Sequence, residues 1–180
     1  MSPLRSNLAD PYEIVLLADY PEAVPVIAAG YEAQWDFWYG SGGKGNAKSD
    51  LLERSQKCAL PLCLVAKRAE WFIGAIAIAA NAITPRPNLN PCLVGLWVAP
   101  AHRKCGIGTA LLNAAITKTA ELGFERVYST TTVIPALFAR TGWTLIGKIP
   151  FKGEEHWLYA FDSELKCSNQ IVAGVNRAGE

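Results

Sequence analysis

The chain has 180 residues, of which 51% are hydrophobic, and its formal net charge is only +1. That length suggests one domain with a sizeable core, and the near-neutral charge gives no reason to expect nucleic acid or a membrane surface as a partner. The longest apolar run, residues 71–80, is too short to cross a bilayer, and residues 1–10 lack the apolar core of a signal peptide. Five scattered cysteines match neither a disulfide framework nor a zinc spacing, so we expect reduced thiols, a cytoplasmic location and no metal.

Hydrophobic periodicity, together with glycine and proline as breakers, divides the chain into strands and helices. The expected strands are residues 12–18, 60–67, 70–80, 93–98, 126–132, 143–151 and 155–162. The expected helices are residues 21–38, 48–57, a helix that ends at Gly123, and residues 134–141. Residues 12–162 are therefore interpreted as one domain, between an N-terminal segment (1–11) and a C-terminal tail (163–180).

One stretch combines a buried strand, a polar connection, a glycine-rich turn and the start of a helix. The strand, residues 93–98, is followed by Arg103, Lys104, Cys105, Gly106, Ile107, Gly108 and Thr109. Glycines at a helix N-terminus let a ligand approach backbone N–H groups that have no partner within the helix, and the helix dipole adds positive charge there. Such a turn suits a pyrophosphate, and Arg103 and Lys104 add full charges at its rim.

Other interpretations of the glycines were weighed. Gly106 and Gly108 could simply shape a turn between strand and helix. A dinucleotide-binding fold fits poorly, because its glycines follow the strand directly and Leu111 stands where its third glycine would be. The glycine-rich loop at residues 40–46 looks like a phosphate-binding loop, but a helix precedes it and Gly45 follows Lys44 where Ser or Thr is needed.

The segment Leu96-Trp97-Val98-Ala99-Pro100, followed by the residues from Arg103 to Gly108, resembles the acetyl-CoA motif of the GCN5-related N-acetyltransferase (GNAT) family. The resemblance covers residues 12–162 and includes the order of the expected strands and helices. It implies an α+β fold in three α/β/α layers, around a mixed, mostly antiparallel sheet of about seven strands. It also implies transfer of an acetyl group from acetyl-CoA to a primary amine, by direct attack in a ternary complex.

The resemblance further implies where the substrates bind. Acetyl-CoA would contact Leu96, Trp97, Val98, Arg103, Lys104, Cys105, Gly106, Ile107, Gly108, Thr109, Thr131 and Phe138. Within this set the turn would hold the pyrophosphate, the strand would pair with the pantetheine arm, and a backbone N–H near Val98 would stabilise the oxyanion. The acceptor would be a small amine or a peptide N-terminus, and the protein a monomer or homodimer.

The chain departs from the family pattern at the proton-transfer positions. Many members carry a tyrosine at the position of Phe138 and an asparagine at that of Thr131, and phenylalanine cannot protonate the leaving thiolate. The candidate bases are Glu32, Tyr128 and His156, and each has a purely structural alternative: a solvated helix charge, a core residue or an exposed hairpin residue. A water relay without a base, and a non-catalytic CoA-binding module, are the remaining alternatives.

Aromatic residues are concentrated before the glycine-rich loop. Trp35, Phe37, Trp38 and Tyr39 could line an acceptor pocket, because aromatic faces attract ammonium groups, or could belong to the core.

Overall fold

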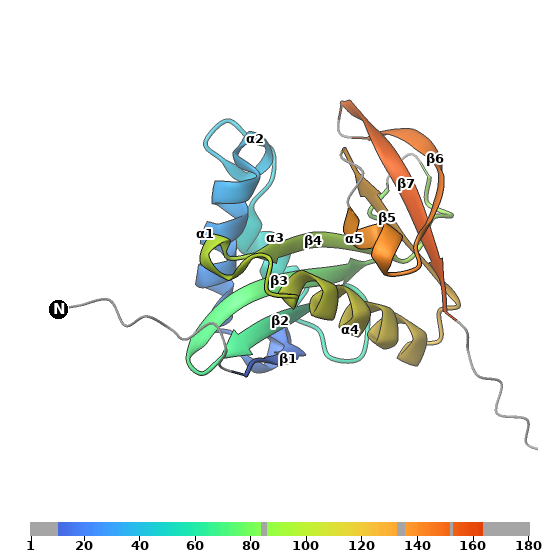
Figure 1. Cartoon of the computed structure of the whole chain (residues 1–180). Coiled ribbons are helices and arrows are strands. Elements are labelled where there is room, and N and C mark those ends of the chain that lie inside the picture. The colour runs from blue at the N-terminus through green and yellow to red at the C-terminus, as the bar shows by residue number, and fades with distance from the viewer. Residues whose placement is uncertain (1–10, 84–85, 133–135, 152, 164–180) are drawn as a thin grey trace, which may run out of the picture.

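The computed structural model describes residues 11–83, 86–132, 136–151 and 153–163, which form one open sheet with helices on both faces (Figure 1). The strands are β1 (Glu13–Leu16), β2 (Leu62–Arg68), β3 (Trp71–Ala79), β4 (Cys92–Val98), β5 (Arg126–Thr131), β6 (Thr144–Phe151) and β7 (Glu154–Asp162). The α-helices are α1 (Ala23–Gln34), α2 (Asp36–Tyr39), α3 (Ala47–Glu53), α4 (Ile107–Glu121) and α5 (Ala136–Arg140). Two short 3₁₀ turns, η1 (Leu17–Asp19) and η2 (Pro100–His102), follow β1 and β4.

The strand order is β1-β2-β3-β4-β5-β7-β6, and every neighbouring pair is antiparallel except β4 and β5. A parallel pair needs a long crossover connection, which the helix α4 supplies between these two strands. The expected mixed, mostly antiparallel sheet of about seven strands is thus confirmed.

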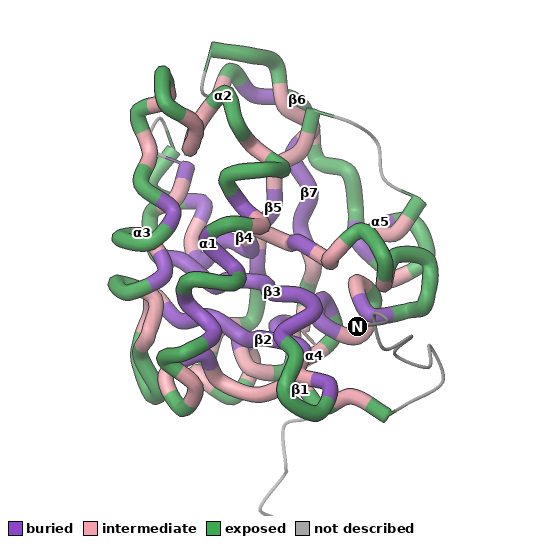
Figure 2. Tube along the Cα trace, turned by 90° about the vertical axis from the view of Figure 1, so that its left-hand side faces the viewer, coloured by how far each residue is buried: buried purple, intermediate pink, exposed green. Residues whose placement is uncertain are grey.

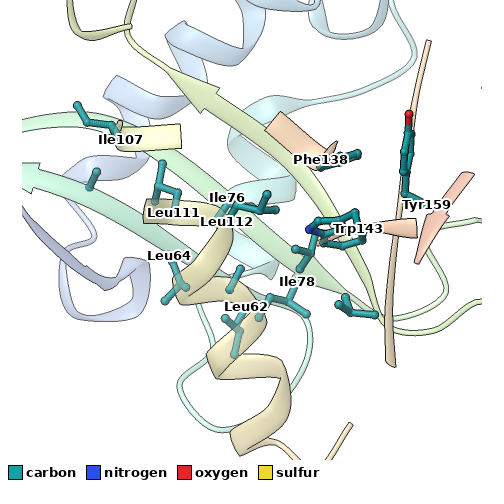
Figure 3. Close-up of a cluster of buried hydrophobic side chains, with 14 of the residues drawn as sticks. Leu62, Leu64, Ile76, Ile78, Ile107, Leu111, Leu112, Phe138, Trp143 and Tyr159 are labelled. Atoms are coloured by element: carbon teal, nitrogen blue, oxygen red, sulfur yellow. The ribbon is translucent and has the colours of Figure 1, made fainter. Parts of the chain in front are cut away.

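Each face of the sheet has its own helices and its own core. On one face α4 packs over β2, β3 and β4, where Leu111 and Leu112 meet Ile76 and Ile78 (Figure 3). On the other face α1 and α3 cover a second cluster, which includes Tyr31 and Trp97. The long buried stretches of β2 and β3 in Figure 2 follow from this arrangement, because both of their faces are covered.

The first helix is shorter than the sequence suggested. The expected helix at residues 21–38 breaks at Trp35, whose φ of −127° and ψ of 53° are not helical, and α2 then begins at Asp36. The break lets Tyr39 stack on Tyr31 and donate a hydrogen bond to Asp50 of α3, at 2.8 Å. These contacts need a chain reversal between the elements, so helical periodicity alone cannot reveal them.

Other boundaries shift by a few residues. The helix expected at residues 48–57 ends at Glu53, and the strand expected at residues 12–18 gives way to η1 after Leu16. Residues 133–135, at the start of the last expected helix, and 164–180, in the expected tail, lie outside the described residues. Within the described residues, the model contains no helix with the length and apolar character needed to span a membrane.

We expect Leu111→Ala to lower the free energy of unfolding by about 2–5 kcal/mol, because it leaves a cavity in a closed core. Leu111 is fully buried. It packs so tightly against β3 that a Cβ added to Gly74 would lie only 2.9 Å from the Leu111 Cδ1 atom. Urea denaturation measures the change.

The matched control is Leu52→Ala on α3, where the same atoms are removed from a side chain that is 53% exposed. A loss at Leu52 equal to that at Leu111 would contradict this description of the core.

Candidate functional site

The sheet opens between β4 and β5. The two strands pair only at Cys92 with Tyr128 and at Leu93 with Ser129, and beyond these pairs they diverge. Figure 1 shows β5, β7 and β6 turned steeply away from the β1–β4 part of the sheet. The divergence leaves a cavity of about 340 Å³, within the usual range for small-molecule sites.

A β-bulge in β4 marks the point of divergence. Ala75 of β3 pairs with Trp97 and Ala77 pairs with Val94, so Gly95 and Leu96 together oppose the single residue Ile76. Gly95 has a φ of +62°, a left-handed conformation that glycine adopts without a steric penalty. The bulge bends β4 and redirects its edge away from β5.

Tyr31 of α1 holds this bulge from the side of the second core. Its buried hydroxyl donates a hydrogen bond of 2.7 Å to the carbonyl oxygen of Gly95. Burial raises the pKa of the Tyr31 phenol well above its ordinary value, so the group stays protonated and remains a donor. Burial and the hydrogen bond to Asp50 also raise the pKa of the adjacent Tyr39 to about 12.

The cavity passes through the sheet and has a different wall on each face. Toward α4 the wall is formed by Ile76, Leu93, Leu96, Leu112, Thr131, Leu137 and Phe138. Toward α1 it is formed by Trp35, Phe37, Val94, Thr130, Glu154 and His156. The alternation of side chains along β5 and β7 places Thr130 and His156 on the α1 side, with Tyr128 and Leu158.

The glycine-rich turn lies where the sequence predicted it, at the N-terminus of α4. Gly106 is the N-cap residue with a φ of +81°, and the first helical hydrogen bond runs from the N–H of Ala110 to the Gly106 carbonyl oxygen. Lys104, Cys105 and Thr109 are exposed around the turn, whereas Ile107 is buried and anchors it. The turn therefore presents backbone N–H groups and a lysine to an approaching anion.

Arg103, expected at the rim of the turn, makes two hydrogen bonds within the chain. Its Nε donates to the carbonyl oxygen of Val98 at 2.9 Å, and its Nη2 donates to Oε1 of Gln34 at 2.7 Å. The guanidinium thus joins the end of β4 to the end of α1. Trp97, next to Val98, is buried against Gly30, where a Cβ would come within 2.3 Å of the indole ring.

The structure separates the three candidate bases. His156 lines the cavity, with its ring edge-on to Phe151 at 5.2 Å between centroids. Tyr128 instead packs in a small cluster with Leu89, Cys92, Ile149 and Leu158. Glu32 is exposed on α1 and faces a separate shallow hollow beside α2. Only His156 is therefore placed beside a substrate cavity.

Phe138 and Thr131 lie together in the α4-side wall. Phe138 is almost fully buried, with ring centroids 4.9 Å from Trp143 and 4.8 Å from Tyr159. The position at which family members carry a tyrosine thus holds a packed hydrocarbon that can transfer no proton.

Of the aromatic residues before the glycine-rich loop, Trp35 and Phe37 line the cavity, whereas Tyr39 belongs to the second core. The sequence analysis missed the roles of Tyr31 and Gly95. A glycine inside an apolar strand is a recognised bulge signal and could have identified Gly95. Nothing local in the sequence marks Tyr31, because its role depends on a contact with Gly95, 64 residues away.

Comparisons with known proteins agree with this architecture. The sequence profile of the acetyltransferase (GNAT) family matches residues 27–141. None of the curated proteins matches the sequence.

Solved structures resemble the chain over most of its length. An aminoglycoside 6'-N-acetyltransferase from Enterococcus faecium has 15% identity and a TM-score of 0.65, over 83% of this chain and 96% of its own. An aminoglycoside 6'-N-acetyltransferase complexed with coenzyme A has 15% identity and a TM-score of 0.63, over 83% of this chain and 96% of its own. The protein yncA of Salmonella typhimurium, solved with its cofactor acetyl-CoA, has 14% identity and a TM-score of 0.68, over 87% of this chain and 96% of its own. Likeness at such low identity establishes the shared fold.

We expect Gly95→Ala to destabilise the protein by about 2 kcal/mol, because an L-residue is strained at this φ. Its Cβ would also lie 2.6 Å from the Tyr31 hydroxyl, so the hydrogen bond that holds the bulge would be displaced. Thermal and urea unfolding measure the change.

Gly42→Ala is the control, since a Cβ there meets no atom within 4 Å. If Gly95→Ala proved as harmless as Gly42→Ala, the bulge would not need glycine.

Proposed function

Because the chain belongs to the acetyltransferase (GNAT) family, we propose that it is an N-acetyltransferase that moves the acetyl group of acetyl-CoA to a primary amine. The observation that carries the proposal is the cavity between β4 and β5, whose lining comes from both faces of the sheet and includes Leu112 of α4, the helix with the glycine-rich N-terminus. A two-sided cavity lets two substrates meet without passing each other. Direct attack in a ternary complex is the mechanism that such a geometry favours.

The α4 face is the proposed binding face for acetyl-CoA. Its wall is apolar, as a pantetheine arm requires, and it leads along β4 to the glycine-rich turn. Backbone N–H groups of Ile107, Gly108 and Thr109, with Lys104, would hold the pyrophosphate. Arg103 would join them by exchanging Gln34 for a phosphate oxygen. A backbone N–H near Trp97 or Val98 would stabilise the charge that develops on the acetyl oxygen.

The α1 face is the proposed acceptor side, and His156 is the proposed base. Imidazole takes the proton that the attacking nitrogen must lose as the new C–N bond forms and the C–S bond breaks. Phe138 supplies no proton to the departing sulfur, so water protonates it. A thiol with a pKa of roughly 8.5 is a tolerable leaving group without a dedicated acid.

One observation favours a second candidate function, a CoA-binding module without catalysis. Phe138 stands in the wall where a proton donor would be expected, and its ring packs against Trp143 and Tyr159. Release of free CoA thiol in the presence of a broad panel of amines would exclude this alternative. A cytoplasmic location and a monomeric or homodimeric state stay predictions from the sequence.

We expect Gly108→Leu to weaken acetyl-CoA binding at least tenfold, the loss of roughly one charge-assisted hydrogen bond. A Cβ at position 108 would not clash with the rest of the protein, because it would contact only the Val98 Cγ2 atom, at 3.8 Å. The added side chain should therefore obstruct the ligand and leave the fold intact.

Calorimetric titration measures this affinity, and the unfolding temperature controls for folding. Gly108→Ala should lie between the wild type and Gly108→Leu. An unchanged dissociation constant in a folded Gly108→Leu protein would remove the turn from the binding site.

We expect His156→Gln to lower kcat by about a hundredfold, the usual contribution of a general base. In the wild type, activity should fall on acidification as the imidazole becomes protonated, and the substitution should abolish that acidic limb. Steady-state rates across pH measure both effects.

The comparison variants are Tyr128→Phe and Glu32→Gln, which change the two candidates that lie outside the cavity lining. Each should retain the acidic limb. Loss of the limb in either variant, with its persistence in His156→Gln, would reassign the base.

A further inference from the structure

The α1-side wall of the cavity carries one fixed charge. Glu154 is the only carboxylate among the described residues that line the cavity, and no lysine or arginine lines it. A single negative charge with no positive neighbour in the lining attracts cations to the cavity. The acceptor half of the cavity is thus built for a positively charged molecule.

Glu154 and its neighbour Glu155 differ in the contacts that their carboxylates make. Glu155 lies on the opposite face of β7, where its carboxylate accepts a hydrogen bond from Lys148 at 2.5 Å. Lys148 also lies over the Trp157 ring, 4.1 Å from its centroid. No ion pair with Glu154 is found within the described part of the chain, and the residue is exposed beside Gly153 at the hairpin end of β7. The Glu154 carboxylate is thus exposed and part of the cavity lining.

The facing side of the cavity mouth is aromatic. Trp35 lies at the break between α1 and α2, and Phe37 on α2 is 69% exposed while lining the same cavity. Exposed aromatic surface opposite a carboxylate suits a ligand with an apolar segment and a cationic end.

The distance between Glu154 and His156 and the volume of the cavity limit the length and size of the ligand. Glu154 and His156 are two residues apart on one face of β7, which separates them by roughly 7 Å. The cavity of about 340 Å³ must also admit the acetyl end of acetyl-CoA, so the space left for the acceptor is small.

We propose that Glu154 anchors a second cationic nitrogen of the acceptor, and that the acceptor is a small diamine with an apolar chain. One nitrogen attacks the acetyl group beside His156, and the other pairs with Glu154, while the chain between them lies against Trp35 and Phe37. This inference rests on the proposed acetyl transfer and assigns the substrate class of that site.

The test measures kcat/KM by thiol release for three acceptors of similar length: 1,5-diaminopentane, pentylamine and 6-aminohexanoate. The wild type should prefer the diamine to pentylamine by roughly fivefold or more, the value of an ion pair at a partly exposed site. Glu154→Gln should remove most of this preference through KM. Glu154→Lys should shift the preference to 6-aminohexanoate, whose second group is a carboxylate.

Glu155→Gln is the matched control, because it makes the same change in charge one residue away and on the opposite face of β7. It should keep the wild-type ratio of diamine to pentylamine. Acetyl-CoA affinity and unfolding temperature, measured for every variant, separate a local effect from misfolding.

The outcomes distinguish the two proposals. Equal rates of the wild type with diamine and pentylamine, or an equal loss of preference in Glu155→Gln, would overturn the role of Glu154 and leave acetyl transfer standing. Acetylation of aminoglycosides without acetylation of the diamine would overturn the assigned substrate class. If acetyl-CoA binds and no amine is acetylated, the proposed function itself fails.

Discussion

The site depends on the bulge at Gly95. A regular β4 would continue its ladder with β5 and close the sheet, because unpaired strand edges readily form hydrogen bonds. Gly95 prevents this by adopting a left-handed conformation, and Tyr31 fixes that conformation through the 2.7 Å hydrogen bond to its carbonyl oxygen. The cavity is thus maintained by a hydrogen bond from a buried phenol of the second core to a residue of the cavity wall.

The same opening explains why the two walls differ so strongly. The α4 wall comes from one continuous hydrophobic core, and its side chains are fixed by packing. The α1 wall is assembled from the break between α1 and α2 and from the final hairpin, segments more than one hundred residues apart, and it holds the charged and titratable groups. Rigid packing suits the arm of a common cosubstrate, whereas variable segments suit the choice of acceptor.

Arg103 links these two halves. Its guanidinium bridges the Val98 carbonyl, at the end of β4, and Gln34, the residue before Trp35. One side chain therefore spans from the acceptor-side helix to the start of the turn that leads into α4. The backbone of the turn is set independently of that bridge, by the left-handed Gly106 and the buried Ile107.

The sequence by itself determined the order of the strands and helices along the chain, the position of the turn at Gly106 and Gly108, and the family, because local periodicity and short motifs carry this information. Through the resemblance it also predicted that Phe138 and Thr131 contact acetyl-CoA, and both residues line the cavity. Only the tertiary structure placed His156, and neither Glu32 nor Tyr128, in the cavity lining. It also broke the first helix at Trp35 and turned Arg103 toward Gln34. It alone set Tyr31 against Gly95 and Glu154 opposite the aromatic residues. These features depend on which face of a strand a side chain occupies and which distant segment meets it, and neither is encoded within one local window of sequence.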